Sequence, residues 1–410
     1  MFASNKRGLL ALYAALSAGG LSAIPTLALA QAPAKAADEI VIGVIEDRSG
    51  SASFYSQESV KSLKLYVEEI NKGKLAHATQ VAGSAPGILG KPVKTLFEDD
   101  ENNSNLTVVK ARRLLERGAN VLFFLSGSGA TMQGRVVCTE QKVLCIAPTN
   151  VSSRLVQAPN DDYIFTIAPQ SELSGKAYTD AWAKLGAKKI AVVSDSSATS
   201  RVVKDAYRKT WEAAGFTTVA DELMEIGATD ANSQVLRVKQ QQPDIVFDAM
   251  ASASESAALY KGLARQGMTG QRWAQNNLTA TPKIWQLSGD AINGVVVVDP
   301  IGPNSPNTNQ IKKVYEDKYG AQTFVWLHAV VWDGLALLKT AANTAKSADG
   351  TALRDAMEKI SNFPSGFGQA GNTLSFAKGK HNGTTEKGLV IVQFANQKPS
   401  LLWTTYQPAQ

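Results

Sequence analysis

The chain has 410 residues, of which 44% are hydrophobic and 19% are charged. This length predicts two or three domains, and this hydrophobic fraction excludes a mostly disordered chain. The formal net charge is +6, but the basic residues are scattered and form neither a stripe nor a nucleic-acid-binding motif. We therefore expect no nucleic-acid partner.

The N-terminus has the pattern of a bacterial secretory signal peptide. Lys6 and Arg7 precede an apolar stretch from Leu9 to Ile24, and the small-x-small sequence Ala28–Ala30 follows it. The apolar stretch is short for a membrane span and contains Gly and Ser. We expect residues 1–30 to be removed by cleavage near Ala30, which predicts a periplasmic protein.

Alternating strand and helix patterns fill the rest of the chain. Ile40–Ile45 is an apolar run with β-branched residues, typical of a buried parallel strand, and Val60, Leu63, Val67 and Ile70 follow at helical spacing. Further strands are predicted at 93–97, 121–125 and 143–147, and others begin near residues 190, 216, 244, 272 and 294. The later starts are roughly 22 to 28 residues apart with an amphipathic stretch in each interval, which indicates βαβ units.

This many strands exceeds one ordinary sheet, so we expect two α/β lobes with parallel sheets flanked by helices. Ser104 or Asn105 is the expected cap of a helix that Gly118 ends. Residues 73–92 are rich in Gly, Ala and Pro and predict a surface loop. Residues 299–309 contain three prolines and no regular pattern, which predicts a crossover between the lobes.

Few residues suggest catalysis. None of His77, His328 and His381 lies in a zinc motif, and His77 and His328 are best explained as structural histidines. The run Ser126–Ala130 lacks the glycine of a nucleophile elbow, and Met132 occupies the third glycine position of a dinucleotide loop. We expect neither an enzyme nor a bound cofactor or metal.

Two loops have the chemistry to bind a small carboxylate. The Ser126–Thr131 loop follows a predicted parallel strand and opens a helix, whose first N–H groups and hydroxyls are donors. Thr149–Ser153 follows the next strand and repeats this chemistry. Ligands bind at the carboxyl ends of strands in open α/β sheets, although ordinary helix capping explains these hydroxyls equally well.

Two cysteines, Cys138 and Cys145, are present. Export permits a disulfide, and a separation of seven suits the end of a helix and the strand after it. Either a small-loop bridge or two buried thiols is consistent with the sequence.

Several short motifs, in their order and spacing, resemble the leucine/isoleucine/valine-type substrate-binding proteins of ABC transporters. The motifs are Glu39–Ile45, Ala85–Val93, Phe97–Asp100, Gly118–Phe124, Ile146–Pro148, Phe165–Pro169, Lys188–Val193 and His381–Thr384. The resemblance implies the type I periplasmic binding fold, in which two Rossmann-like lobes are joined by three hinge crossovers. It places residues 38–168 and 301–380 in the N-terminal lobe, and residues 169–300 and 381–410 in the C-terminal lobe.

The resemblance also implies a ligand site in the cleft between the lobes. Phe54 or Tyr55 matches the aromatic wall, Ser128 matches the serine that holds a ligand carboxylate, and Val151 stands where the family has a threonine. Ser152 is the alternative donor there. The candidate ligand-binding residues are Phe54, Tyr55, Ser126, Ser128, Gly129, Asn150, Val151, Ser152, Ser197, Thr199, Ala251, Asn276 and Asn277.

One departure from the family affects the expected ligand. Trp273–Asn277 matches the segment that often supplies an acid to a ligand ammonium, but only amides stand there. A buried ammonium without a charged partner is costly. Either Asp248 or Glu255 supplies the acid, or the ligand is an acid or amide without an ammonium.

The leading hypothesis is therefore a monomeric periplasmic receptor that captures a small carboxylate- or amide-bearing metabolite and delivers it to the permease of an ABC importer. That metabolite is a branched-chain amino acid or a related aliphatic or aromatic acid. The alternatives are a ligand-sensing module of the same fold and a secreted hydrolase or reductase using Ser128 or Gly127–Gly129.

Overall fold

The computed structural model describes residues 38–50, 53–302, 305–321 and 323–404. The predicted signal peptide, residues 1–30, lies outside these ranges. Within the described part of the chain, no helix has both the length and the apolar composition needed to cross a membrane.

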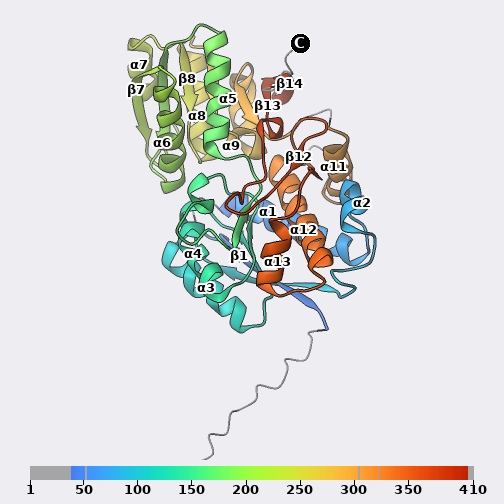
Figure 1. Cartoon of the computed structure of the whole chain (residues 1–410). Coiled ribbons are helices and arrows are strands. Elements are labelled where there is room, and N and C mark those ends of the chain that lie inside the picture. The colour runs from blue at the N-terminus through green and yellow to red at the C-terminus, as the bar shows by residue number, and fades with distance from the viewer. Residues whose placement is uncertain (1–37, 51–52, 303–304, 322, 405–410) are drawn as a thin grey trace, which may run out of the picture. The chain divides into compact units, whose positions relative to one another are not determined.

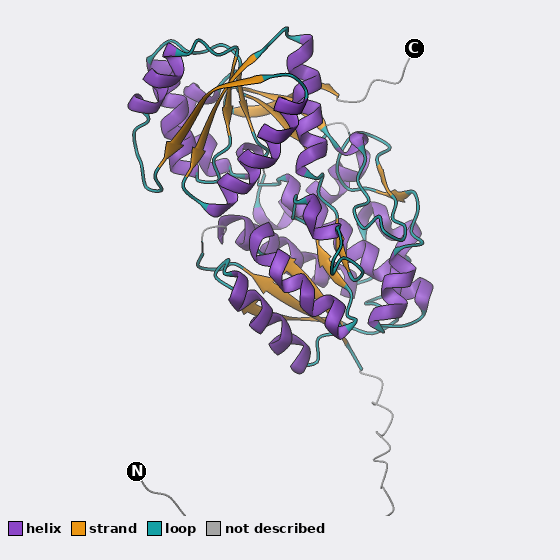
Figure 2. Ribbon diagram, turned by 60° about the vertical axis from the view of Figure 1, so that its left-hand side comes forward, coloured by secondary structure: helices purple, strands orange, loops and turns teal. Residues whose placement is uncertain are grey.

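The first sheet has five parallel strands in the order β2-β1-β3-β4-β5. Its strands are β1 (Ile40–Glu46), β2 (Val93–Asp99), β3 (Val121–Leu125), β4 (Cys145–Ala147) and β5 (Ile164–Thr166). Helices α1 (Ser53–Asn71), α3 (Ser104–Glu116), α4 (Ser128–Gln141) and α12 (Trp326–Ala345) pack around it, and Figure 2 shows the orange strands between purple helices. All five residues of β3 are buried, which explains its continuous apolar sequence.

The second sheet has seven strands in the order β14-β13-β10-β9-β8-β6-β7. These are β6 (Lys189–Asp195), β7 (Thr217–Met224), β8 (Ile245–Asp248), β9 (Arg272–Ala274), β10 (Val296–Asp299), β13 (Val390–Ala395) and β14 (Lys398–Thr404). The first five are parallel, whereas β13 and β14 join antiparallel. Figure 1 shows β7 and β8 among helices α5 (Ser171–Lys184), α6 (Ala198–Ala213), α7 (Asn232–Gln240) and α8 (Ala253–Arg265).

The chain passes between the two sheets three times. It leaves the first sheet after β5, and it leaves the second after β10 through a segment that precedes α11 (Pro306–Tyr319). It then adds α12, α13 (Gly350–Met357), β11 (Phe363–Pro364) and β12 (Thr373–Leu374) before it enters the second sheet again at β13. Parallel sheets flanked by helices confirm the predicted fold class. The short helices are η1 (Ala76–Ala78), α2 (Thr79–Ala82), η2 (Ser153–Val156), α9 (Asn277–Ala280), α10 (Pro282–Ser288), η3 (Gly289–Ile292) and η4 (Glu386–Gly388).

Three local predictions were wrong. The cap of α3 is Asn103, whose side chain accepts hydrogen bonds from the N–H groups of Asn105 and Leu106, rather than Ser104 or Asn105. The 73–92 segment is not a simple surface loop, because it contains η1 and α2 and buries several apolar side chains. The end of the proline-rich crossover is helical from Pro306, since proline at a first helical position needs no N–H partner.

A disulfide joins Cys138 in α4 to Cys145 in β4, and both residues are buried. It closes a short loop with a sequence separation of seven. Replacing both cysteines by Ser should lower the free energy of unfolding by about 2–3 kcal/mol, because the unfolded chain regains the freedom of that loop. Urea denaturation of the two proteins measures the difference. An unchanged midpoint would show that the bridge adds no stability.

Candidate functional site

A cavity of about 80 Å³ lies where β3 and β4 end, and we call it the Ser126 cavity. Its lining comes from the loops after β3, β4 and β9, and from α1, α6 and α12. The residues are Tyr55, Leu125, Ser126, Gly127, Ser128, Thr149, Asn150, Val151, Thr199, Val203, Gln275, Asn276, Trp326 and Leu327. This is the edge of an α/β sheet at which ligands bind, and the volume suffices for a small polar group.

Asn150 is held rigidly and presents a free acceptor. Its Nδ2 donates to the carbonyl oxygens of Ser126, at 3.3 Å, and Phe124, at 3.4 Å. The side chain is buried, and its Oδ1 has no hydrogen-bond partner among the described residues. An unpaired buried acceptor is costly, so Asn150 is prepared to accept a hydrogen bond from a ligand N–H or O–H.

Donors come from the start of α4 and from hydroxyl groups. Gly127 caps α4 without a side-chain bond, and Ser128 is the first helical residue. The first N–H groups of the helix and its positive dipole end favour an anion or a carbonyl oxygen here. Ser126 is committed elsewhere, because its hydroxyl donates to Asp100 Oδ1 at 2.8 Å. Burial raises the pKa of that Asp100 carboxyl.

The loop after β9 contributes Gln275 and Asn276 to the lining, and hydrogen bonds that involve backbone carbonyls hold this loop in place. Gln275 Nε2 donates to the carbonyl oxygens of Ala249, at 3.0 Å, and Met250, at 2.7 Å. Trp326 Nε1, at the start of α12, donates to the carbonyl oxygen of Asn276 at 3.1 Å. This hydrogen bond joins a helix that packs on the first sheet to a loop of the second.

The structure brings seven predicted site residues together and leaves six outside the Ser126 cavity. Those that line it are Tyr55, Ser126, Ser128, Asn150, Val151, Thr199 and Asn276. Outside it are Phe54, Gly129, Ser152, Ser197, Ala251 and Asn277.

Three of the outside residues have other roles. Ser197 caps α6 by accepting from Ser200 N at 3.1 Å. Asn277 Nδ2 donates to the carbonyl oxygens of Met250 and Ala251. Phe54 lines a wider hollow of about 550 Å³, together with residues from α10 and the β13–β14 turn.

Sequence reasoning missed Trp326 and Leu327. They begin α12, whose mostly apolar sequence suggests an ordinary core helix. The tertiary fold brings these two residues to the cavity, and no local sequence pattern marks them. Gln275 was considered with its neighbours but not chosen, although it stands directly after β9, where a ligand-site residue is expected.

Neither acid proposed for a ligand ammonium is available to the Ser126 cavity. Asp248 accepts from Tyr260 Oη at 2.6 Å and from Met250 N at 2.9 Å, and burial raises its pKa to about 6. Glu255 accepts from Gly227 N and from the hydroxyls of Ser252 and Ser254. None of the 14 lining residues is Asp, Glu, Lys, Arg or His.

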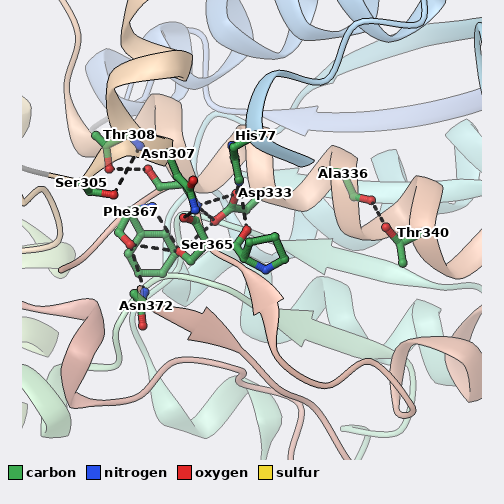
Figure 3. Close-up of polar contacts among 12 residues, drawn as sticks. His77, Ser305, Asn307, Thr308, Asp333, Ala336, Thr340, Ser365, Phe367 and Asn372 are labelled. Atoms are coloured by element: carbon green, nitrogen blue, oxygen red, sulfur yellow. Dashed lines mark hydrogen bonds and ion pairs between the residues drawn. The ribbon is translucent and has the colours of Figure 1, made fainter. Parts of the chain in front are cut away.

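The three histidines lie in packed structural contacts. Figure 3 shows His77 beside Asp333, with its Nε2 2.9 Å from Pro364 O and 3.5 Å from Asp333 Oδ1. His328 stacks on Tyr315, and the Nε2 of His381 lies 3.0 Å from Glu358 Oε1. In the described ranges, no three His, Cys, Asp or Glu residues are grouped so that they could hold a metal ion.

A sequence profile described as periplasmic binding protein matches residues 39–398. The chain belongs to this family. Among curated proteins, it is 24% identical over 344 residues to the Leu/Ile/Val-binding protein BraC3 of Rhizobium johnstonii, a match that covers 82% of this chain and 89% of that protein. It is also 25% identical over 270 residues to an amino acid binding protein of Pseudomonas aeruginosa, covering 65% of each.

Solved structures of the family share the fold. The leucine binding protein LivK of Thermotoga maritima matches with a TM-score of 0.74 and 18% identity, over 88% of this chain and 97% of that one. LivJ of Streptococcus pneumoniae, solved with isoleucine, matches with a TM-score of 0.73 and 20% identity over the same shares. These matches confirm the type I periplasmic binding fold and the resemblance seen in the sequence. The family binds substrates and works in the periplasm.

Proposed function

We propose that the protein is the solute-binding receptor of an ABC importer and that its ligand is a small acid or amide without an ammonium group. Membership of a substrate-binding family supports the first part. The lining of the Ser126 cavity supports the proposed ligand class. It offers helix N–H groups, hydroxyls and the free Asn150 Oδ1, but no ionisable acid for an ammonium.

The ligand would lie with its carboxylate or carbonyl oxygen at the start of α4, near Ser128. An N–H or O–H of the ligand would donate to Asn150 Oδ1, while Tyr55 and Trp326 would enclose its apolar part. Tyr55 and Trp326 lie on helices that pack on the first sheet, whereas Gln275 and Asn276 follow β9 of the second sheet. A ligand that contacts both pairs would therefore favour closure of the two lobes. We further propose that the receptor acts as a monomer and delivers the ligand to membrane permease subunits.

Thermal shift and calorimetry with the purified protein test this ligand class. The panel contains leucine, isoleucine, valine and phenylalanine, their deaminated acids, and the corresponding amides. We expect acids or amides without an ammonium to raise the melting temperature, since a ligand at 100 times its dissociation constant adds about 2.7 kcal/mol. Equal affinity for leucine and its deaminated acid would contradict the proposed class.

The Asn150→Asp variant provides an independent check. It places a carboxylate where Oδ1 now stands, so acid ligands should lose about tenfold or more in affinity through like-charge repulsion. The matched control is Asn309→Asp, because Asn309 is exposed on α11 and the substitution changes the net charge equally. Equal affinities of the two variants would place the ligand elsewhere.

A further inference from the structure

A second cavity, of about 90 Å³, lies beside the point where the chain crosses back from the second sheet. We call it the Asp299 cavity. Asp299 ends β10 and is only 3% exposed. Its Oδ1 accepts from Ile301 N at 2.6 Å, which fixes the turn at the crossover.

The other carboxylate oxygen of Asp299 is unused. Oδ2 is buried and makes no hydrogen bond with any described group. The nearby Thr279 hydroxyl gives its proton to the carbonyl oxygen of Asn276, at 2.9 Å. Burial raises the pKa of Asp299 to about 6, and the contacts with the Thr279 hydroxyl and the Ile301 N–H, which favour the ionised form, offset the cost of burial only in part. A buried carboxylate in this state either takes up a proton or binds a cation.

The rest of the lining favours an organic cation. Trp285, Phe324 and Trp326 supply three aromatic side chains, and the remaining residues apart from Thr279 and Asp299 are aliphatic. The indole N–H of Trp285 donates to the carbonyl oxygen of Leu278, and that of Trp326 donates to the carbonyl oxygen of Asn276. Both indole N–H groups are therefore already paired, and the two rings contribute apolar carbon atoms to the lining. None of its nine lining residues carries a positive charge.

A metal ion fits this chemistry poorly, because hard cations need several oxygen ligands. Aromatic rings combined with one carboxylate suit an alkylammonium group, which is large, weakly hydrated and attracted to ring faces. The 550 Å³ hollow is a neighbour of the Asp299 cavity, because Trp285 and Val325 line both.

We propose that the Asp299 cavity is a binding site for an alkylammonium group, distinct from the Ser126 cavity, with Asp299 as the counter-ion and Trp285, Phe324 and Trp326 as the aromatic wall. The proposal does not depend on the identity of the ligand in the Ser126 cavity. Trp326 lines both cavities.

Calorimetric titration with choline, tetramethylammonium and the neutral choline isostere dimethylbutanol tests the site. We expect both cations to bind about tenfold or more tightly than the isostere, because only they pair with Asp299. Failure of choline to bind, or equal binding of choline and dimethylbutanol, would overturn the proposal.

Asp299→Asn is the decisive variant, because it keeps the Oδ1 acceptor for Ile301 N while removing the charge. We expect it to lose the preference for choline over dimethylbutanol. The control Asp317→Asn removes an exposed carboxylate of α11 and should bind choline as the wild type does. Circular dichroism and the melting temperature verify that each variant is folded.

Two further variants locate the bound cation. Phe324→Leu removes an aromatic ring from the wall and changes no polar group. It should weaken choline binding by about threefold or more, because the cation loses its attraction to that ring. Asn150→Asp should leave choline affinity unchanged. If Asn150→Asp alters it as strongly as Asp299→Asn, choline occupies the Ser126 cavity and the separate site is wrong. A failed search for acid ligands would leave this test unaffected.

Discussion

Trp326→Ala should weaken binding of the tightest acid or amide ligand by about a hundredfold and lower the free energy of unfolding by about 3–5 kcal/mol. The residue is 3% exposed, and its ring forms part of the Ser126 cavity. Truncation removes that wall and also the donor to Asn276 O. Trp326→Phe keeps an aromatic ring in the wall but loses the N–H donor and part of the ring area, so we expect roughly a tenfold loss of affinity.

A destabilised control separates the two effects. Leu335 is buried on the same helix and lines neither cavity, so Leu335→Ala should cost similar stability and leave ligand affinity unchanged. Calorimetry well below the melting temperature gives the affinities, and urea denaturation gives the stabilities. If Trp326→Ala binds the ligand within about threefold of the wild type, Trp326 is not part of the ligand site.

Asp333→Ala is expected to lower the free energy of unfolding by about 3–5 kcal/mol. Asp333 is fully buried in α12 and accepts from Gly366 N, at 2.8 Å, and from Ser365 Oγ, at 3.1 Å, while His77 lies 3.5 Å away. Figure 3 shows Asp333 of α12 beside Ser365, which follows β11, and beside His77 of the 73–92 segment. Removing the carboxylate leaves buried donors unpaired.

The matched control lies on the same helix. Thr340→Val removes the hydroxyl that donates to Ala336 O at 2.8 Å but leaves no buried donor without a partner, so it should cost about 1 kcal/mol or less. Limited proteolysis gives a second readout: the 73–92 segment should be cleaved faster in Asp333→Ala than in Thr340→Val. Equal stability of the two variants would contradict a structural role for the cluster around Asp333.

The strands and the two donor-rich loops could be predicted from the sequence because both depend on local patterns. β3 is apolar throughout because both its faces are covered, and the loops that follow β3 and β4 must meet at one sheet edge. Composition indicated one crossover, the proline-rich segment 299–309, whereas the full set of three was predicted only through the family resemblance.

Side-chain direction limited the prediction of the site. Thr199 and Val203 are four positions apart on α6 and so share the face toward the Ser126 cavity, whereas Ser197 turns back to cap the helix. The sequence shows a hydroxyl at both Ser197 and Thr199, so it does not reveal which of the two faces the cavity. Trp326 lies 200 positions from Ser126, so only the tertiary fold brings the two together.

Because the chain passes between the sheets three times, the second sheet cannot be completed until the last strands of the chain, β13 and β14, are available. In the second sheet β10 pairs with β13, and Val296 lies opposite Gln393. One edge of β10 therefore has no neighbouring strand until β13 has been made. A polypeptide that emerges from a ribosome or a translocation pore with its N-terminus first therefore carries an open edge at β10 until its last strands appear. Truncation before Val390 would make that edge permanent and turn a transient stage of synthesis into a surface for aggregation.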